Sequence, residues 1–544
     1  MKKRLLIIVS ILLLLSYYSS LEACTNFLVT KGASSNNATY IFYANDGAYA
    51  PSFPVHKAGI YKRGDKIKIV SWPNKKEGFI PRATKEYHTI GYHINEYNVT
   101  IGETTFGGRE ELHNTDEFLE YWHLMELGLQ RSKTAKEMVK VITYLVEKYG
   151  YGSEGESFSI ADPNEAWILE MVGKGKGEKG AIWIAVKVPD GYVSAHANHA
   201  RIGYVNLEDK KNVMYSKDMI DFAVKKGYYD PNGGKKFSFS DVYDPVTPAK
   251  LRYTEMRVWD FFRRVAPSMN ISADYARGIQ GAERMPLWIK PDNKISLEDV
   301  MNLSRSHYDN TKWDMEKGHK AGPHGNPNRS RPLTFKVGET DASWERPIST
   351  PLTAYAFIAE LKTDKNKNTN SVLWLGLDNT YTNIYMPFNA SVVELPKSYS
   401  NADYNKFSWD SMWWVFNFVG NYVNLRYSDM IVDVKTKQQE LQSQIIADYR
   451  ALESDHKNIN NSLLRTKEYG EFSKKQSKKL LAEWTNLANN LIVKYNDGLI
   501  RNEQMQAKQK GYSEDFYKKS IEDDPERIIP VWDVKSENKE PRNY

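Results

Sequence analysis

The sequence predicts an α+β protein in which helices cover antiparallel sheets. Its short strand patterns come in blocks on either side of a pair of helical segments, without a regular alternation of strand and helix. Regular alternation would indicate a parallel doubly wound sheet, so this order favours a layered sandwich. The composition of the 544-residue chain also changes near its end, where long polar helical patterns predict a helical region added to the core.

The first half of the chain supplies most of the expected strands. Two of them, over 27–30 and 39–43, flank a turn rich in Gly, Ser and Asn and are expected to pair as a hairpin. A helix over 115–130 is followed by a second over 134–150, which a capping box opens. Further strands are predicted over 66–71, 89–93, 99–104, 157–161, 166–172, 181–188 and 192–197.

The second half of the core mixes helices with strands that are expected to complete the sheets. A glycine- and proline-rich loop over 318–332 separates the two kinds of pattern. Helices are predicted over 218–227, 248–265 and 297–308, and strands over 349–361, 371–377, 384–386 and 392–394.

The C-terminal part is predicted to be a helical extension over 425–519, docked on the preceding domain at 24–424. Apolar residues such as Leu441, Ile445 and Trp484 recur there at near-helical spacing, which favours a hairpin of two helices. A coiled coil that binds a partner is the alternative, although the apolar stripes are short and irregular. The charged tail over 520–544 is expected to be loosely held.

The first 23 residues have the features of an export signal. Lys2, Lys3 and Arg4 give a positive start, 5–15 is an unbroken apolar run, and 21–23 is a short cleavage region. The apolar run is shorter than the roughly 20 residues that a membrane-spanning helix needs. We therefore expect removal of the signal and an exported, soluble mature chain in the periplasm or outside the cell.

The only cysteine of the chain, Cys24, directly follows this signal. Cleavage before it would place a thiol and a free α-amine on one residue. A thiol with a pKa of about 8.5 is mostly protonated at neutral pH, and an α-amine of about 7.7–8.0 is the nearest group that could take its proton. This layout is typical of N-terminal nucleophile hydrolases. A lone cysteine also excludes a disulfide framework and thiolate metal sites.

Two other interpretations of Cys24 stay open. Residues 21–24 approximate the lipobox of a bacterial lipoprotein, in which lipid on the sulfur would remove the nucleophile. Glu22 fits that motif poorly and 25–29 resembles a strand entering a core, whereas Leu21 departs from the small residue of an ordinary cleavage site. The second alternative is a structural cysteine, which cleavage would leave exposed at a new terminus.

Charge and composition narrow the class of partner. The net charge of +6 falls to about +4 once the signal, with three basic residues and one acidic residue, is removed. Such a mild and dispersed charge on a long chain predicts no nucleic-acid partner. Aromatic residues make up 13% of the chain, which keeps open a surface protein that binds peptides or glycans through aromatic side chains.

Four ordered motifs carry a resemblance to a known family. They are CTNFLVTKGAS from Cys24, NE at 95–96 with IGETT at 101–105, ADPNEAWILE at 161–170 and SAHANHARI at 194–202. Together they resemble the C69 family of cysteine dipeptidases, relatives of the penicillin V acylase and bile salt hydrolase group, over a span reaching about residue 424. The resemblance implies an αββα N-terminal nucleophile hydrolase sandwich and hydrolysis of dipeptides.

The resemblance also implies roles for individual residues. Cys24 matches the nucleophile, Asp46 the aspartate that holds the terminal amine near the thiol, and Asn198 the asparagine that donates to the tetrahedral intermediate. The wider group has an arginine where this chain has Tyr43, so that permanent charge is either missing or supplied elsewhere. The alternative for Asp46 is a turn residue before Gly47.

Two further positions match more loosely. Thr104 lies near a second donor position, where its hydroxyl could contact substrate, and Arg257 resembles a distal arginine of the site. An ordinary salt-bridging helix residue is the alternative for Arg257, with Arg252 as the fallback. His196 is conceivable as a base, although a terminal amine makes a second base unnecessary. His196 and His199 would point to opposite faces of a strand, so they are not expected to share a metal ion.

The sequence therefore predicts an exported cysteine dipeptidase that acts on small peptides without metal or cofactor. The Cys24 thiolate would attack the scissile carbonyl, its own amine would take and return the proton, and water would resolve the thioester. The alternatives are an acylase or conjugated-amide hydrolase of the same fold, and a lipid-anchored surface binding protein. A homo-oligomer stays open, and no integral membrane segment is expected after signal removal.

Overall fold

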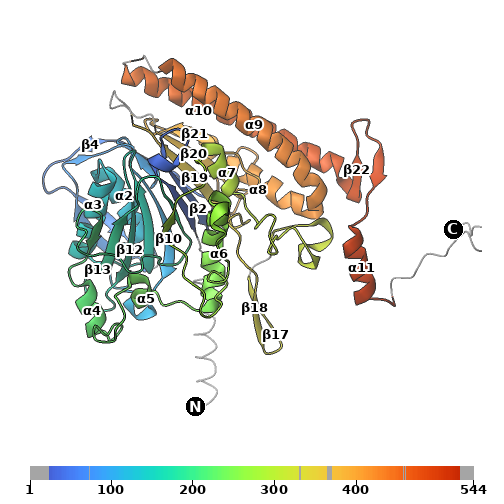
Figure 1. Cartoon of the computed structure of the whole chain (residues 1–544). Helices are drawn as coiled ribbons and strands as arrows, with labels where there is room; N and C mark the ends of the chain where they lie inside the picture. Colours follow the sequence, from blue (N-terminus) through green and yellow to red (C-terminus); the bar gives the residue numbers. More distant parts are fainter. Residues whose placement is uncertain are drawn as a thin grey trace, which may run out of the picture.

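The protein is α+β, as predicted, and its two large sheets are antiparallel (Figure 1). The computed structural model describes residues 24–72, 74–329, 333–363, 371–456, 459 and 461–526. The predicted signal at 1–23 and residues 527–544 of the predicted tail lie outside the described residues, as do 330–332 of the glycine- and proline-rich loop.

The first sheet begins at the candidate nucleophile. Its strand order is β16-β14-β1-β2-β19-β20-β21. The hairpin predicted from the sequence is present, because β1 (Thr25–Val29) pairs antiparallel with β2 (Thr39–Asp46) and Asn26 lies opposite Tyr43. The other strands of this sheet are β14 (Val193–His196), β16 (Trp288–Ile289), β19 (Thr353–Leu361), β20 (Val372–Leu377) and β21 (Met386–Asn389).

The second sheet has the order β15-β13-β12-β11-β10-β9-β8-β3. Its strands are β3 (Val55–His56), β8 (Thr89–Ile90), β9 (Ile94–Asn95), β10 (Thr100–Gly107), β11 (Gly155–Ala161), β12 (Ala166–Gly173), β13 (Ala181–Lys187) and β15 (Val213–Tyr215). β9 and β10 pair at one position, where Ile94 lies opposite Thr100. Among the described residues, the strand pairing between β9 and β10 is limited to this position.

The two sheets pack against each other, and helices cover their outer faces. β10 contacts both β1 and β2, which brings the sheets together at the start of the chain. Phe27 of β1 stacks on Phe261 of α6 with ring centroids 4.3 Å apart, so one helix layer covers the first sheet. α3 contacts β11, β12 and β13, so a second helix layer covers the other sheet. The layers follow the order helix, sheet, sheet, helix.

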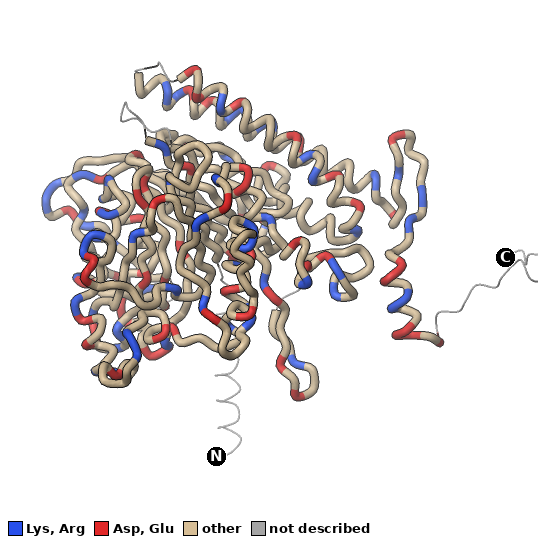
Figure 2. Tube along the Cα trace, in the orientation of Figure 1, with Lys and Arg blue, Asp and Glu red and all other residues tan. Residues whose placement is uncertain are grey.

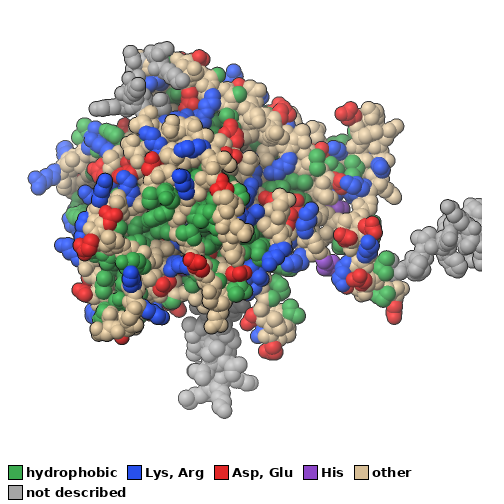
Figure 3. Space-filling model, in the orientation of Figure 1, with side chains coloured by type: hydrophobic (Ala, Val, Ile, Leu, Met, Phe, Trp, Pro, Cys, Tyr) green, Lys and Arg blue, Asp and Glu red, His purple; other side chains and the backbone are tan. Residues whose placement is uncertain are grey.

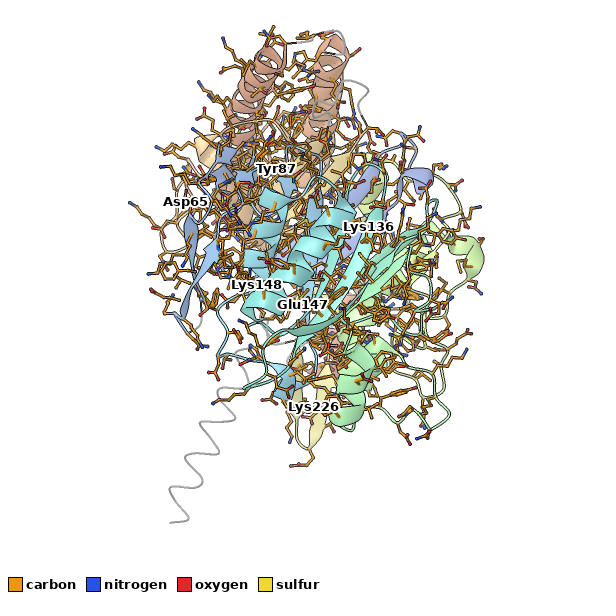
Figure 4. All side chains as sticks on the ribbon, turned by 90° about the vertical axis from the view of Figure 1, so that its left-hand side faces the viewer. Asp65, Tyr87, Lys136, Glu147, Lys148 and Lys226 are labelled. Atoms are coloured by element: carbon orange, nitrogen blue, oxygen red, sulfur yellow. The ribbon has the colours of Figure 1, made fainter. Side chains whose placement is uncertain are left out.

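The helices differ in length and in the layer to which they belong. Figure 4 looks onto α3, whose Lys136, Glu147 and Lys148 lie on the outer surface. The helices over the second sheet are α2 (Tyr121–Arg131) and α3 (Ala135–Tyr149). Those that contact the first sheet include α6 (Pro248–Val265), α7 (Leu297–Leu303) and α8 (Met412–Tyr422), and the shorter helices elsewhere are α4 (Met219–Lys225), α5 (Phe239–Tyr243) and α11 (Glu514–Asp523).

Some predicted boundaries are wrong, each for a local reason. The first helix was expected from residue 115, but it begins at Tyr121, because Glu117 closes a turn onto Asn114 and Glu120 forms a capping box with His123. The predicted start of α3 is confirmed, since the Thr134 hydroxyl accepts the Glu137 amide. The predicted helix over 297–308 ends at residue 303, and 392–394 forms no strand.

Long helices follow α8. α9 (Tyr427–His456) and α10 (Ser462–Lys494) lie side by side along one edge of the molecule, and both contact β21 (Figure 1). Trp484 of α10 is fully buried against Phe416 of α8. The described residues also form small two-stranded sheets. These are β4 (Gly59–Ile60) with β7 (Lys85–Glu86), β5 (Lys66–Val70) with β6 (Glu77–Pro81), β17 (Thr334–Val337) with β18 (Thr340–Ser343), and β22 (Leu499–Arg501) with β23 (Ala507–Gln509).

The surface carries charges of both signs. Lys and Arg alternate with Asp and Glu along the chain trace and over the face seen in the space-filling view (Figures 2 and 3). Among the helices of the described chain, none is long and apolar enough to cross a membrane.

Candidate active site

Cys24 lies directly before β1, with its side chain buried where β2 and β10 meet. Its sulfur is 3.3 Å from Oε1 of Glu103, 3.6 Å from the Tyr43 hydroxyl and 3.7 Å from the Asn45 side-chain nitrogen. Burial, with the neighbouring carboxylates of Glu103 and Asp46, raises the pKa of the Cys24 thiol well above its ordinary value. The thiol is therefore protonated in this arrangement, and reaction requires a group that removes the proton.

Asp46 lies at the end of β2 and is fully enclosed. Its carboxylate pairs with Arg346, and its Oδ1 accepts a hydrogen bond from the Thr353 hydroxyl at 2.5 Å. Burial alone would lower the pKa of Arg346, but Tyr253 and the acidic groups of Asp46 and Cys24 outweigh it and raise the pKa. Arg346, which lies 300 residues from Asp46 along the chain, therefore brings a buried positive charge into the neighbourhood of Cys24.

Arg257 connects the candidate nucleophile to the segment after β14. From α6 it donates to the Cys24 carbonyl at 2.7 Å and to the Thr25 hydroxyl at 2.9 Å. Its other terminal nitrogen donates to the Ala197 carbonyl at 3.0 Å and to Oδ1 of Asn198 at 2.9 Å. Burial and the nearby Arg346 lower the pKa of Arg257 to about 9. Arg257, rather than the fallback at position 252, therefore lies at the site.

Asn198 is oriented from both ends of its amide. Its oxygen accepts from Arg257, and its nitrogen donates to the Thr105 carbonyl at 2.6 Å. The backbone of Asn198 has a φ of 63°, a left-handed conformation that asparagine tolerates better than most residues. An amide nitrogen carries two N–H donors, so a second donor remains for another acceptor.

Thr104 and His196 contact each other. The Thr104 hydroxyl is 2.7 Å from Nδ1 of His196, and the Ser159 hydroxyl is 2.9 Å from Nε2 of the same ring. Burial lowers the pKa of His196 to about 3, so the ring is neutral at physiological pH. His199 instead bonds Glu255 at 3.0 Å. The contacts described for these side chains do not bring Thr104 or His196 to the sulfur of Cys24.

Glu103 and Tyr43 are site residues to which the sequence assigned no role. The Tyr43 hydroxyl donates a short hydrogen bond to Oε1 of Glu103, the atom nearest the sulfur. Glu156 on the adjacent strand hydrogen-bonds Glu103, and burial together with that carboxylate raises the pKa of Glu156 well above its usual value. Acidic residues are rarely buried unless they are paired. A glutamate within the predicted strand at 99–104 was therefore a sequence feature that could have indicated a functional role for Glu103.

A small aromatic pocket adjoins this group. It has a volume of about 180 Å³ and shares Tyr43 and Asn45 with the surroundings of Cys24. Its opening is marked by Tyr49, which is 38% exposed, whereas Tyr43 on its inner wall is 1% exposed. The lining consists of Tyr43, Asn45, Tyr49, Tyr92, His93, Tyr121, Trp122, Met125 and Tyr355.

In the part of the chain that the structure describes, no group of three or more His, Cys, Asp or Glu side chains is placed to hold a metal ion.

The fold and site define a layered α+β protein whose candidate catalytic centre is a buried thiol. Residues 23–440 match peptidase family C69, and the chain belongs to this family. It is therefore a peptidase.

Proteins that are similar to this chain at low identity are named as probable dipeptidases. A probable dipeptidase of Latilactobacillus sakei is 24% identical over 428 residues, covering 75% of this chain and 82% of the relative. One from Salmonella dublin is 24% identical, covering 67% of this chain and 80% of the relative. Probable dipeptidase B of Streptococcus pyogenes serotype M1 is 24% identical, covering 78% and 82% respectively.

Proposed function

We propose that the protein is an exported cysteine dipeptidase whose nucleophile is Cys24 at the terminus left by signal removal. The observation that carries the proposal is the position of the thiol. It directly precedes β1, in contact with Glu103 and Tyr43, and Arg257 holds its carbonyl. Membership of peptidase family C69 and the names of the relatives support peptide hydrolysis. The helix, sheet, sheet, helix order of layers supports an N-terminal nucleophile hydrolase fold.

The chemistry follows from the groups near the sulfur. The free α-amine of Cys24 takes the thiol proton, the thiolate attacks the scissile carbonyl, and the same proton goes to the departing amine. A thioester remains, which water hydrolyses to release the acyl part as a free acid. The second N–H of Asn198 is the side-chain donor proposed to stabilise the oxyanion. Asp46, held by Arg346, is the acidic group proposed to keep the terminal amine near the thiol.

Intact mass and N-terminal sequencing of the protein exported by its own host test the first step. We expect an unmodified terminus at Cys24, located in the periplasm or outside the cell. A diacylglycerol on the sulfur, or a terminus at another residue, would contradict the proposal and favour an anchored binding protein.

Hydrolysis of a dipeptide panel by the wild type and by Cys24→Ser tests the second step. A hydroxyl is a much weaker nucleophile than a thiolate at neutral pH, so we expect kcat to fall by at least about 100-fold in the variant. Retention of wild-type kcat by Cys24→Ser would exclude Cys24 as the nucleophile. Thermal unfolding of both proteins controls for loss of folding.

A further inference from the structure

A groove of about 550 Å³ lies between α7 and α9, and two basic side chains are part of its lining. We propose that this groove binds a phosphate-bearing small molecule, whose phosphate group is held by Arg305 and Lys435. The groove shares no lining residue with the aromatic pocket beside Cys24. The inference therefore concerns a second site and does not rest on the proposed function.

The two basic groups are anchored on neighbouring backbone carbonyls. Nε of Arg305, just after α7, donates to the Thr380 carbonyl at 3.1 Å. Nζ of Lys435, on α9, donates to the Tyr381 carbonyl at 2.7 Å. Because Thr380 and Tyr381 are consecutive residues, side chains that are 130 positions apart in the chain bring their positive groups to one place in the groove.

Both groups keep hydrogen-bond donors beyond those that anchor them. Nη2 of Arg305 is buried and has no hydrogen-bond partner among the described residues. Nζ of Lys435 also donates to Oε1 of Gln438 at 3.2 Å, which leaves one of the three N–H groups of its ammonium form. Phosphate oxygens are suitable acceptors for both, since a guanidinium binds them through its planar fork and an ammonium binds them as a point charge.

The charges at the groove favour an anion. In the described part of the chain, no salt bridge joins Arg305 or Lys435 to a carboxylate. Burial and the guanidinium of Arg305 lower the pKa of Lys435 well below its ordinary value, although Asp309 and Glu316 act in the opposite direction. The acidic residue in the lining, Glu298, is exposed to solvent. A bound dianion would offset the repulsion between the two basic groups.

The rest of the groove suits the body of a small molecule. Pockets that bind such ligands have volumes of about 300–1,000 Å³, and this groove falls within that range. Neutral polar and apolar side chains make up much of the remaining lining, so an uncharged body attached to the phosphate can bind beside it. They include Asn302, Gln439, Ser443, Met301, Ile446 and Ala447.

Isothermal titration calorimetry of the full chain tests the ligand class. The probes are inorganic phosphate, glycerol 3-phosphate, glycerol and acetate. We expect both phosphates to bind, glycerol to give no binding, and acetate to bind at least about 10-fold more weakly, because it carries one negative charge. Failure of both phosphates to bind, or equal affinity for acetate, would overturn the inference.

Substitution of the two basic residues tests the position of the site. Arg305→Gln and Lys435→Gln should each weaken phosphate binding by at least about 10-fold, because each removes a charge-assisted hydrogen bond. Lys437→Gln is the matched control on the same helix. Lys437 lies outside the lining and pairs with Glu483 at 2.9 Å, so its variant should bind phosphate like the wild type.

Gln439→Glu covers the case in which loss of a basic residue prevents folding. Gln439 is exposed and lines the groove, so this change adds a negative charge to the lining at an exposed position. Repulsion should weaken phosphate binding by at least about 5-fold. Wild-type affinity in Gln439→Glu would place the phosphate elsewhere and overturn the inference. Dipeptide hydrolysis enters none of these measurements, so the outcome is independent of the proposed function.

Discussion

Arg346 lies 300 residues from Asp46 along the chain, and the fold brings the two side chains into contact. The Arg346 side chain is buried and forms an ion pair with Asp46. It also lies close enough to Cys24 for this group to contribute to the raised pKa of Arg346. Breaking a buried ion pair by removing one partner leaves the other charge without compensation, which costs far more than losing an exposed pair. The Asp46–Arg346 pair is therefore expected to support both the site and the fold.

Arg346→Gln should lower the free energy of unfolding by about 3–5 kcal/mol, because Asp46 would stay buried without its cation. Denaturant unfolding measures the change. Lys68→Gln is the matched control, since Lys68 pairs with Glu77 where both side chains are about half exposed, and such pairs contribute about 1 kcal/mol or less. Similar unfolding free energies for the two variants would contradict this account of Arg346.

α9 is joined to the first sheet by the Gln442 side chain, which forms the two backbone hydrogen bonds that a neighbouring strand would otherwise form. Gln442 accepts the Tyr385 amide at 2.8 Å and donates back to the Tyr385 carbonyl at 2.9 Å. One side chain thus satisfies both polar backbone groups of a buried residue just before β21. The helix contributes hydrogen bonds as well as apolar contacts to this junction.

Gln442→Leu should destabilise the protein by about 3 kcal/mol, because it leaves a buried N–H and a buried C=O without partners, each costing about 1–3 kcal/mol. Gln444→Leu, an exposed position on the same helix, is the control and should change stability by less than about 0.5 kcal/mol. Denaturant unfolding followed by circular dichroism compares the two. If both variants unfold like the wild type, the Gln442 bonds do not stabilise the junction.

The response of the protein's stability to acid depends in part on the buried carboxylate of Glu255. Burial alone would raise the pKa of Glu255, but Arg201 and His199 outweigh it and lower the pKa to about 2. An unfolded glutamate has a pKa of about 4.3. Because the folded value is the lower one, this group stabilises the protein above about pH 4.3, and the contribution is lost as the pH falls towards 2.

The pKa of this glutamate is thus about 2 lower in the folded than in the unfolded protein, which corresponds to about 3 kcal/mol of stability. Between pH 5 and pH 2 the wild type should therefore lose about 3 kcal/mol more unfolding free energy than Glu255→Gln, which has no carboxyl to protonate at this position. Unfolding free energies measured across this pH range check the prediction. Parallel curves for the two proteins would show that Glu255 is not ion-paired in solution.

Local sequence patterns are enough to predict the class of fold and to identify Cys24 as the candidate nucleophile. Strand periodicity, turn residues and the cap at Thr134 act over a few residues, so the β1–β2 hairpin and the start of α3 could be predicted. The start of α2 differs from the prediction because the turn at Asn114–Glu117 and the capping box at Glu120 place the first helical residue at Tyr121. The position of Cys24 after an apolar leader is likewise a local pattern, although that leader lies outside the described residues.

The surroundings of Cys24, by contrast, are formed by segments that lie far apart in the chain. Arg346 reaches Asp46 from 300 positions away, and Glu103 reaches the sulfur from another sheet. No local spacing encodes such contacts, because they depend on how the two sheets pack against each other. Periodicity shows which side chains share a face, but the charge and burial around a thiol arise only once distant segments meet.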